Sequence, residues 1–472
     1  MNVLLISTYD LGHQPFGLAS LAAWLQHDGA QIACNDLAVE KLNEEAVKNA
    51  RMICLHIPMH TATRLAIPLI ETCRRLNPGA HICCYGLYAP LNEAYLRKMG
   101  ANSIVGGEFE SEIAQIYAGI SSADISTFSK KPTSLPSITK LSKLQFRKPN
   151  REGLPQLTSY SKLIMPNGEE RTVGYTEASR GCKHMCRHCP VVPVYNGNFR
   201  IVQRDVVMDD IRQLVRGGAS HISFGDPDFF NGVGHAIPLV QSLHREFPDI
   251  SYDVVVKIEH LLKFHDMLTI LKDTGCLIIT SAVESVDDRV LAYLSKGHTR
   301  DEFLRVVELV RAAGIHLGPT FVPFTPWTSI YGYLELLSVI EQMELVESVA
   351  PVQLAIRLLL PQGSHLFQLK EMARWVGDFD EASLAYPWVH PDPRVDALHS
   401  RIKRIVQNGE ARGKTRCEIF YEVFDAAEET AFISANASRR PPDKTAPKSS
   451  PPRMTEAWYC CAEPTEDQFS RL

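Results

Sequence analysis

The chain has 472 residues, of which 45% are apolar, and its formal net charge at pH 7 is −5. This length and apolar content predict two or three domains with ordinary globular cores, and the negative charge argues against a general nucleic-acid-binding surface. The sequence has 12 cysteines, but it shows neither a leader-like N-terminus nor an apolar run of about 18 residues. These features argue against a disulfide scaffold and against a membrane span. We therefore expect a cytoplasmic enzyme without nucleic-acid or membrane partners.

Residues 1–120 alternate short apolar runs with helical patterns. We expect the apolar runs to form strands at residues 3–7, 31–35, 52–57, 81–85 and 103–105. Such alternation predicts a doubly wound α/β domain around a parallel sheet, with a ligand-binding edge formed by the loops that follow the strands. Two of these loops carry His13 and His60, which could equally be ordinary hydrogen-bonding residues.

The first part of residues 121–168 is rich in Ser, Lys, Thr and Pro, so we expect this segment to be an interdomain linker. A second alternation of strand and helix patterns follows over residues 169–365. We expect its strands near residues 172–178, 219–225, 251–256, 276–283, 315–322 and 350–359. Residues 366–434 are expected to be helical, and the Ser-, Pro-, Lys- and Arg-rich start of residues 435–472 predicts a flexible tail.

The most specific feature of the chain is a cysteine motif after the expected strand 172–178. Cys182, Cys186 and Cys189 have the spacing C-x3-C-x2-C, which lets one loop hold a corner of an iron–sulfur cubane through three thiolates. The fourth iron would then be open to a small molecule. The alternative is a zinc site with His184 or His188 as a fourth ligand, but zinc motifs more often pair two cysteine knuckles, and the sequence has no second knuckle.

With this motif the chain resembles the radical S-adenosylmethionine (SAM) family. The resemblance implies a partial (βα)6 barrel over residues 169–365, a 4Fe-4S cluster on the three cysteines and SAM bound to the open iron. It also implies reductive cleavage of SAM to a 5'-deoxyadenosyl radical, with electrons from an external donor of the flavodoxin or ferredoxin type. Since a fold alone does not give the substrate, the loops at the strand ends would decide it.

The domain of residues 1–120 resembles the cobalamin-binding-type domain that precedes many barrels of this family. Domains that bind cobalt through histidine show the pattern D-x-H-x-x-G. In this chain Asp10 lies three residues before His13, and Gly17 lies four residues after it. Axial ligation by His13 cannot be carried over, so the resemblance leaves cobalamin binding open.

Four charged residues of the second domain are candidate cofactor contacts. Asp226 follows the second expected barrel strand, where many relatives hold the SAM ammonium through an acceptor such as a carboxylate; a turn or capping role is the alternative. Glu284 lies in a segment, Ser281–Ser285, that resembles a SAM-contacting segment of the family. Lys257 and Arg357 lie in otherwise apolar strands, where they could bind a carboxylate in the lumen or form internal salt bridges.

The end of the chain carries a second specific motif. Residues 456–464 read Glu-Ala-Trp-Tyr-Cys-Cys-Ala-Glu-Pro, which resembles the group of radical SAM proteins named for a C-terminal CUAEP or CCAEP tail, with selenocysteine or cysteine at the position of Cys461. A position that accepts sulfur or selenium indicates nucleophilic, redox or soft-element chemistry. Cys460 and Cys461 are therefore candidate catalytic residues, and the alternative is that they are incidental tail residues.

Three functional hypotheses follow. In the first, a radical SAM enzyme acts on a small molecule while the tail thiols hold or deliver a thiol-reactive group such as sulfur, selenium or trivalent arsenic. In the second, a cobalamin-dependent radical SAM enzyme transfers a methyl group to an unactivated carbon or phosphorus. In the third, the cluster is structural and the chain is a binding module. The sequence determines neither the substrate nor the oligomeric state.

Overall fold

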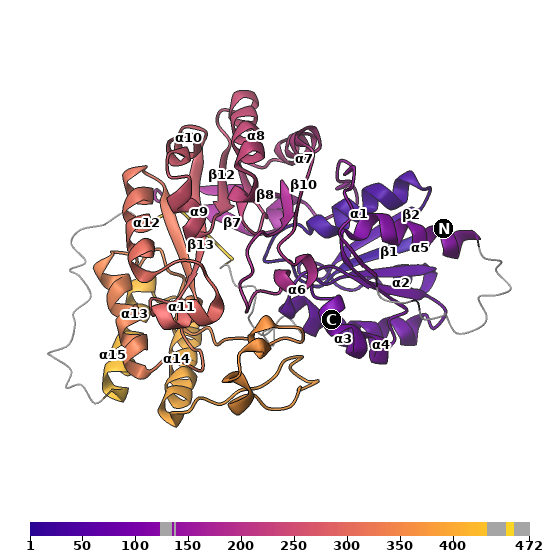
Figure 1. Cartoon of the computed structure of the whole chain (residues 1–472). Helices are drawn as coiled ribbons and strands as arrows, with labels where there is room; N and C mark the ends of the chain where they lie inside the picture. Colours follow the sequence, from indigo (N-terminus) through magenta and orange to yellow (C-terminus); the bar gives the residue numbers. More distant parts are fainter. Residues whose placement is uncertain (123–134, 136–137, 432–449, 457–472) are drawn as a thin grey trace.

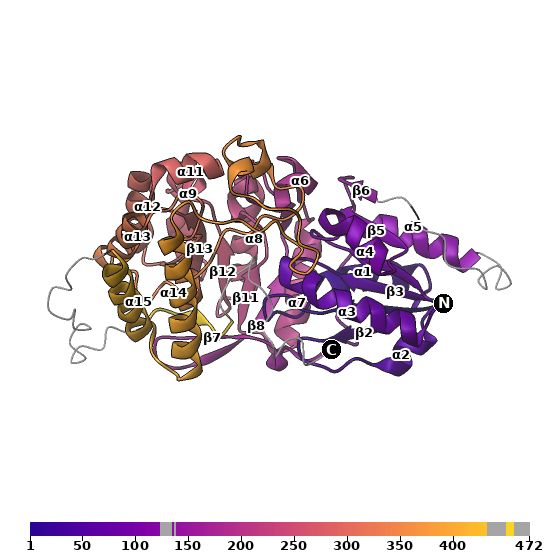
Figure 2. The same ribbon diagram turned by 90° about the horizontal axis from the view of Figure 1, so that it is seen from below.

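The structure is a computed structural model of the whole chain, and it describes residues 1–122, 135, 138–431 and 450–456. Two α/β units lie side by side, the N-terminal one in indigo and violet and the larger one from magenta to orange (Figure 1). Seen from below, the C-terminal helices lie on the side of the larger unit that is remote from the first unit (Figure 2). Cys460 and Cys461 lie outside the described residues.

The first unit is built on a parallel sheet with the strand order β2-β1-β3-β4-β5-β6. Its strands are β1 (Asn2–Ser7), β2 (Gln31–Asp36), β3 (Met52–His56), β4 (His81–Tyr85), β5 (Ser103–Gly107) and β6 (Ile138–Lys140). The first five coincide with the apolar runs expected to be strands. The sixth was not expected, because it comes from the segment predicted to be a linker.

Helices cover both faces of this sheet, which is why its strands are apolar on both sides. Leu4 and Ile6 of β1 pack on one face against α2 (Glu44–Asn49), α3 (His60–Leu76) and α4 (Glu93–Met99). Val3 and Leu5 point to the other face, since successive side chains of a strand alternate. There they pack against α1 (Phe16–His27) and α5 (Phe109–Ser122). The doubly wound fold expected from the sequence is confirmed.

The second unit contains a curled sheet with the order β14-β13-β12-β11-β8-β7-β15. Its strands are β7 (Lys162–Ile164), β8 (Glu170–Thr176), β11 (His221–Phe224), β12 (Ser251–Val255), β13 (Cys276–Glu284), β14 (His316–Phe321) and β15 (Arg453–Met454). The strands from β8 to β14 are parallel, whereas β7 is antiparallel to both of its neighbours. The segment predicted to be a linker thus supplies strands to both sheets.

Helices cover the outside of the curled sheet. They are α7 (Arg204–Arg216), α8 (Val233–Glu246), α9 (Ile258–Lys263), α10 (Met267–Asp273), α11 (Asp288–Leu294), α12 (Arg300–Ala312) and α13 (Ile330–Gln342). Two further helices, α14 (Pro393–Ala411) and α15 (Arg416–Thr430), pack together, and α15 also packs against α13. Among the described residues, no helix is both long enough and apolar enough to cross a membrane.

The sixth barrel strand expected at residues 350–359 is wrong. Pro351–Leu354 forms a 3-10 helix, and Arg357 makes only an isolated bridge to Phe324. Pro351 cannot donate a ladder hydrogen bond, and the side chain of Gln353 accepts the hydrogen bond of the Phe321 backbone N–H at 3.0 Å. A side chain therefore satisfies the edge of β14 where a sixth strand would have paired, and the parallel part of the barrel ends there.

Candidate functional site

The loop of the cysteine motif starts from a short antiparallel pair. β9 (Ser179–Gly181) pairs with β10 (Phe199–Ile201), and the loop between them ends in α6 (Val191–Tyr195). Gly181 has φ +76°, and a Cβ there would lie 2.4 Å from the ring of Tyr195. Only glycine fits this close approach with a positive φ, so Gly181 sets the direction in which the chain enters the loop.

All three cysteines of the motif line one cavity. The loop is fixed at several points: the Cys189 N–H donates to the Cys186 carbonyl at 3.1 Å, the Lys183 N–H donates to the Asn231 side chain at 3.1 Å, and the Arg187 N–H donates to the Leu294 carbonyl at 2.9 Å. The sequence spacing thus places three thiols on one face of a braced loop.

The arrangement of ligand atoms separates the cluster from the zinc alternative. Within the described residues, the group whose metal-ligand atoms all lie within 4.8 Å of one another is Cys182, His184 and Asp228, and it contains one of the three sulfurs. Three sulfurs bound to one zinc ion, each about 2.3 Å from the metal, would all lie within 4.8 Å of one another. The sulfurs of Cys182, Cys186 and Cys189 do not. Their wider spacing favours a cluster over a single zinc ion on the three thiols.

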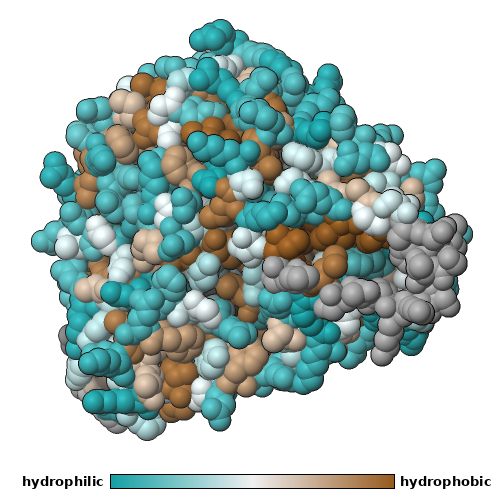
Figure 3. All heavy atoms as spheres, turned by 45° about the vertical axis from the view of Figure 1, so that its right-hand side comes forward, coloured by the Kyte–Doolittle hydropathy of each residue, from teal (hydrophilic) through white to brown (hydrophobic). Residues whose placement is uncertain are grey.

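The cavity lies between the two units and has a volume of about 370 Å³, within the range of small-molecule sites. The first unit contributes the loops after β3 and β4, including Met59, Leu87 and Tyr88, and the barrel contributes the carboxyl ends of its strands. Figure 3 shows apolar side chains gathered in a hollow that hydrophilic surface surrounds. Loops at the carboxyl ends of parallel strands are the usual ligand sites of α/β folds.

Glu284 ends β13 and points into this cavity. It is buried, with 7% of its surface exposed, and has φ +69°. Its Oε1 lies 3.0 Å from Nε2 of His188 and 3.5 Å from Nζ of Lys296. Burial alone would raise the pKa of Glu284, but Lys296 and His188 outweigh it and lower the pKa to about 2. The site therefore holds Glu284 as a carboxylate next to the cysteine loop.

A second acidic group, Asp228, lies in the loop after β11, which β12 separates from β13 in the sheet. Oδ2 of Asp228 lies 2.6 Å from Nδ1 of His260 and 3.2 Å from Nε2 of His184. Burial raises the pKa of Asp228, but the two imidazoles outweigh it and hold the pKa below its usual range. Lys257 also lines the cavity, and its Nζ lies 3.3 Å from the partly exposed Glu259 carboxylate. Lys257 thus combines the two roles that the sequence allowed, a lumen position and an internal salt bridge.

Asp226 and Arg357 are not where the sequence-based interpretation put them. Asp226 does not line the cavity: its carboxylate accepts hydrogen bonds from the Ala178 N–H and the Ser179 hydroxyl. Arg357 pairs with Asp396 at 2.6 Å, and its guanidinium stacks over Trp388. Asp226 therefore stabilises the start of the cysteine loop, which is the turn or capping role that the sequence also allowed. Arg357 forms an internal salt bridge that connects the edge of the barrel to α14.

Other functional side chains were missed by the sequence reasoning. Lys296 and Asp228 were given no role from the sequence, although both line the cavity. Arg180 was not considered, although it is buried and lies 2.7 Å from the Glu177 carboxylate, 2.8 Å from Glu110 and 3.4 Å from Glu108. A charged residue directly before a glycine-cysteine loop is the sequence signal that could have found Arg180. The Arg180 network joins the two units beside the cavity.

The histidines of the first unit differ in their relation to the cavity. His13 does not line it and instead stacks on Tyr175 with ring centroids 4.8 Å apart. His56, at the end of β3, does line it and is buried, and its Nδ1 has no hydrogen-bond partner among the described residues. Burial and Arg180 lower the pKa of His56 to about 3. A neutral, unpartnered imidazole nitrogen at this position fits a metal-bearing cofactor between the units.

Residues 176–336 match the family model described as Radical SAM superfamily. The match starts at the end of β8 and runs through the cysteine loop to α13, so the matched residues include the three cysteines and most of the barrel side of the cavity. A partial barrel is confirmed, but with five parallel strands among the described residues instead of the six that the resemblance implied.

Two cobalamin-dependent radical SAM enzymes of known structure share the fold of most of the chain. TsrM from Kitasatospora setae, a methyltransferase with cobalamin and a 4Fe-4S cluster bound, aligns with a TM-score of 0.59 and 16% identity over 73% of each chain. OxsB, with aqua-cobalamin and SAM bound, aligns with a TM-score of 0.66 and 14% identity over 86% of this chain and 67% of its own. At these identities the likeness establishes the fold, including the first unit.

Curated relatives match only part of this chain. A tRNA-2-methylthio-N(6)-dimethylallyladenosine synthase from Chlorobium phaeovibrioides is 28% identical over 158 residues, which are 31% of this chain and 34% of that protein. The chain spans only about a third of this relative's length. The tRNA-modifying activity belongs to that protein and identifies no substrate for this one.

Proposed function

We propose that this chain is a radical SAM enzyme that cleaves SAM reductively and acts on a small molecule. The observation that carries the proposal is the convergence of Cys182, Cys186 and Cys189 on one cavity at the carboxyl ends of the parallel strands of a radical SAM domain. When bound, a 4Fe-4S cluster would supply the electron that breaks a sulfur–carbon bond of SAM. A flavodoxin or ferredoxin would reduce it.

The chain's own residues would orient SAM around this cluster. Glu284 and Asp228 are held as carboxylates, so each can accept a charge-assisted hydrogen bond from an ammonium or hydroxyl group. Lys257 lines the same cavity with its ammonium close to Glu259 and can bind a carboxylate of SAM or of the substrate. Asp228 replaces Asp226 as the candidate after β11, because Asp226 is occupied by the backbone and side chain of residues 178–179.

Cys460 and Cys461 complete the proposal as redox, nucleophilic or soft-element-binding groups. Their adjacency supports this role, since two neighbouring thiols can exchange with a disulfide or hold a soft element. A small substrate is supported by the cavity volume of about 370 Å³ and by the net charge of −5.

The test is anaerobic reconstitution with iron and sulfide, followed by reduction in the presence of SAM and identification of the products. Formation of 5'-deoxyadenosine is expected, and methylthioadenosine would indicate cleavage on the aminocarboxypropyl side. A variant with all three motif cysteines replaced by alanine is the negative control. A cluster-containing protein that leaves SAM intact under every reducing condition would contradict the proposal and favour a binding module.

A second candidate is a cobalamin-dependent radical SAM methyltransferase. It is favoured by His56, a cavity-lining residue whose Nδ1 has no hydrogen-bond partner among the described residues, and by the shared fold with TsrM and OxsB. Retained corrinoid absorbance after purification with cobalamin would support it. If His56 contacts cobalt, the paramagnetic resonance spectrum of the reduced cofactor should show nitrogen splitting in the wild-type protein and lose it in His56→Phe.

A further inference from the structure

The barrel lumen contains a second cavity of about 110 Å³ below the candidate active site, which we call the lower cavity. Residues 451–454 form one of its walls. Within this segment β15 runs in the direction of the parallel barrel strands, because β7 is antiparallel to both β15 and β8. Tyr175, Thr280 and Thr320 line both the lower cavity and the larger cavity between the two units. The two cavities therefore share a wall inside the barrel.

A carboxylate with a chain of hydrogen-bond donors behind it lines the lower cavity. Oδ1 of Asp253, in β12, accepts hydrogen bonds from Nε2 of His221 at 2.9 Å and from the Ser223 hydroxyl. We assign the His221 proton to Nε2, since a carboxylate can only accept. Oγ of Ser251 lies 2.8 Å from Nδ1 of His221 and accepts a hydrogen bond from Arg171 at 2.9 Å. The Ser251 hydroxyl then donates to Nδ1, so every donor of the chain points toward Asp253.

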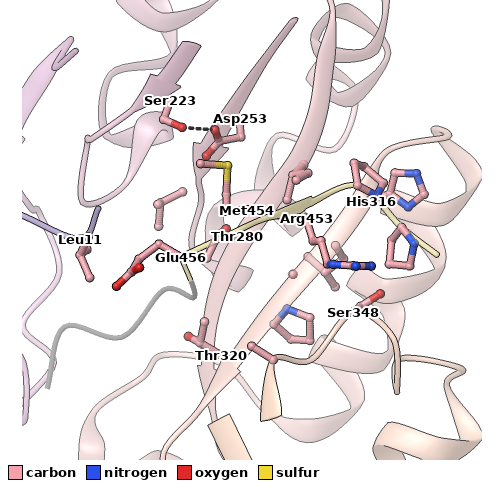
Figure 4. Close-up of a pocket in the computed structure, with 18 of the residues that line it drawn as sticks. Leu11, Ser223, Asp253, Thr280, His316, Thr320, Ser348, Arg453, Met454 and Glu456 are labelled. Carbon is pink, nitrogen blue, oxygen red and sulfur yellow. Dashed lines mark hydrogen bonds between the residues drawn. The ribbon is translucent and has the colours of Figure 1, made fainter. Parts of the chain in front are cut away.

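The other oxygen of Asp253 is left for a ligand. Oδ2 makes no hydrogen bond to a described residue, and no described lysine or arginine pairs with this carboxylate. Figure 4 shows Asp253 at the cavity with Ser223 and Met454 beside it. Hydrogen bonds from neutral donors stabilise a negative charge without cancelling it. The lower cavity thus offers an oriented acceptor that a cationic group can complete.

The lower cavity also has a basic end, which lies away from the larger cavity. Arg416 and Arg453 line it, and Figure 4 shows Arg453 near Ser348 and His316. His316 is the first residue of β14, so this end lies at the amino ends of the barrel strands, opposite the cysteine loop. Two guanidinium groups repel a cation that approaches from there. A cationic ligand would therefore reach Asp253 from the larger cavity.

A glycine in β14 leaves room for such a ligand. Gly318 lines the lower cavity, and a Cβ at this position would meet no atom closer than 3.8 Å, from Ile278 and Thr280. Its φ lies outside the left-handed region, and its pairing with Thr280 is in regular register. Neither the backbone nor the neighbouring atoms require glycine here. Glycine weakens a strand and often marks a place where a ligand approaches closely, so its presence favours an occupied lumen.

A ligand that reaches both cavities would be elongated and apolar in its middle. Asp253 pairs with Ile278 of β13, six residues before Glu284, and a strand rises about 3.3 Å per residue. Asp253 thus lies roughly 20 Å along the strands from the level of Glu284. Leu11 and Val255 line both cavities between these levels. An aliphatic stem with a cationic end matches this arrangement.

We propose that the lower cavity is a substrate subsite, in which Asp253 binds the ammonium end of an elongated aliphatic amine whose other end extends into the larger cavity. Asp253 supplies a charge-assisted acceptor for the ammonium group, and Gly318 supplies the space for the stem. The assignment of the amine as substrate rests on the proposed function, whereas the amine site rests on the geometry of the lower cavity.

Calorimetric titration of the full-length, cluster-reconstituted protein with hexylamine tests the site. We expect at least tenfold weaker binding by Asp253→Asn than by the wild type. Asp273→Asn is the matched control, because it removes the same charge from the exposed end of α10, and it should bind like the wild type. 1-Hexanol and hexanoate, with stems of the same length, should bind the wild type at least tenfold more weakly than hexylamine.

Three results of this titration would overturn the proposal. The first is equal affinity of the wild type and Asp253→Asn for hexylamine, and the second is no binding of hexylamine to the wild type. The third is tighter binding of hexanoate than of hexylamine, which would assign the lower cavity to an anion at Arg416 and Arg453.

A steric variant keeps the proposal falsifiable if Asp253→Asn fails to fold. Gly318→Val leaves Asp253 in place and fills the lower cavity, so it should weaken hexylamine binding at least tenfold. Unchanged affinity in this variant would contradict the proposed site. Formation of 5'-deoxyadenosine is measured on the same proteins: hexylamine binding without SAM cleavage would refute the proposed function alone, and SAM cleavage without hexylamine binding would refute the amine subsite alone.

Discussion

The pair of Glu284 and Lys296 offers a quantitative test of the site's electrostatics. Both side chains are buried, with 7% and 3% of their surfaces exposed. Replacing Glu284 with glutamine removes the carboxylate charge with little change in shape, and it leaves the Lys296 ammonium without its partner. Lys257→Met would remove a cavity ammonium whose carboxylate partner, Glu259, is partly exposed, so it serves as a comparison.

The expected magnitude follows from the pKa of Glu284. Its lowering from 4.5 to about 2 corresponds to on the order of 3 kcal/mol, because one pH unit is worth about 1.4 kcal/mol. A carboxyl whose folded pKa is lowered contributes stability that is fully present above pH 4.5 and is lost as the pH falls toward 2. Leaving a buried partner charge unpaired costs about 3 to 5 kcal/mol in similar cases. We therefore expect Glu284→Gln to destabilise the cluster-free protein at pH 7 by about 3 kcal/mol.

The assay is urea unfolding of the wild-type protein, Glu284→Gln, Lys296→Met and the double variant, all without cluster. The double variant should be less destabilised than the sum of the single variants, with a coupling energy of about 2 to 3 kcal/mol. Glu381→Gln is the control, because its ion pair with Lys98 is exposed and should contribute less than about 1 kcal/mol. A coupling energy below about 0.5 kcal/mol would refute the electrostatic account of Glu284.

Three further predictions concern the cysteine loop and its acidic neighbours. Replacing the three motif cysteines together should abolish the 4Fe-4S signal in iron analysis and paramagnetic resonance. The control is Cys276→Ala, which removes a buried thiol remote from the loop in the sequence and should retain the signal. An unchanged signal in the triple variant would exclude the motif as the ligand set. Asp228→Asn should weaken SAM binding by roughly ten- to a hundredfold, since a charge-assisted hydrogen bond is worth about 1.5 to 3 kcal/mol, and equal binding by variant and wild type would remove Asp228 from the site. Burial raises the pKa of Asp226 to about 7, so the folded protein keeps Asp226 protonated at a pH where the unfolded chain has lost the proton. The stability that the protonated form contributes at low pH is therefore lost as the pH rises toward 7. The melting temperature of Asp226→Asn relative to wild type should accordingly rise between pH 5 and 8, and a pH-independent difference would count against this assignment.

Much of the site was predictable because it depends on local spacing. The thiols of the C-x3-C-x2-C motif lie on one loop, so their convergence follows from chain geometry, and Glu284 could be assigned because it directly follows an apolar strand. The alternation of apolar runs predicted five strands of the first sheet and, of the six strands expected in the barrel, five that are present, since parallel strands are buried on both faces.

The remaining features depend on contacts between residues far apart in the sequence. Asp226 and Asp228 stand two residues apart in the same loop, and only the positions of Ser179 and His260 decide that the first braces the backbone and the second lines the cavity. For Arg357 the sequence left a lumen position and an internal salt bridge open, and only the position of Asp396, on a helix much later in the chain, decides for the salt bridge.

The sequence by itself determined the class of fold and the placement of three cysteines on one loop, and it showed two adjacent thiols at residues 460 and 461, because each of these depends on short-range patterns of residue type. Only the tertiary structure decided that Arg180 joins the two units through Glu108 and Glu110, and that β15 pairs with β7 and runs toward the cavity. No local pattern encodes these features: a two-residue strand has no detectable periodicity, and a buried ion pair exists only where packing brings its members together.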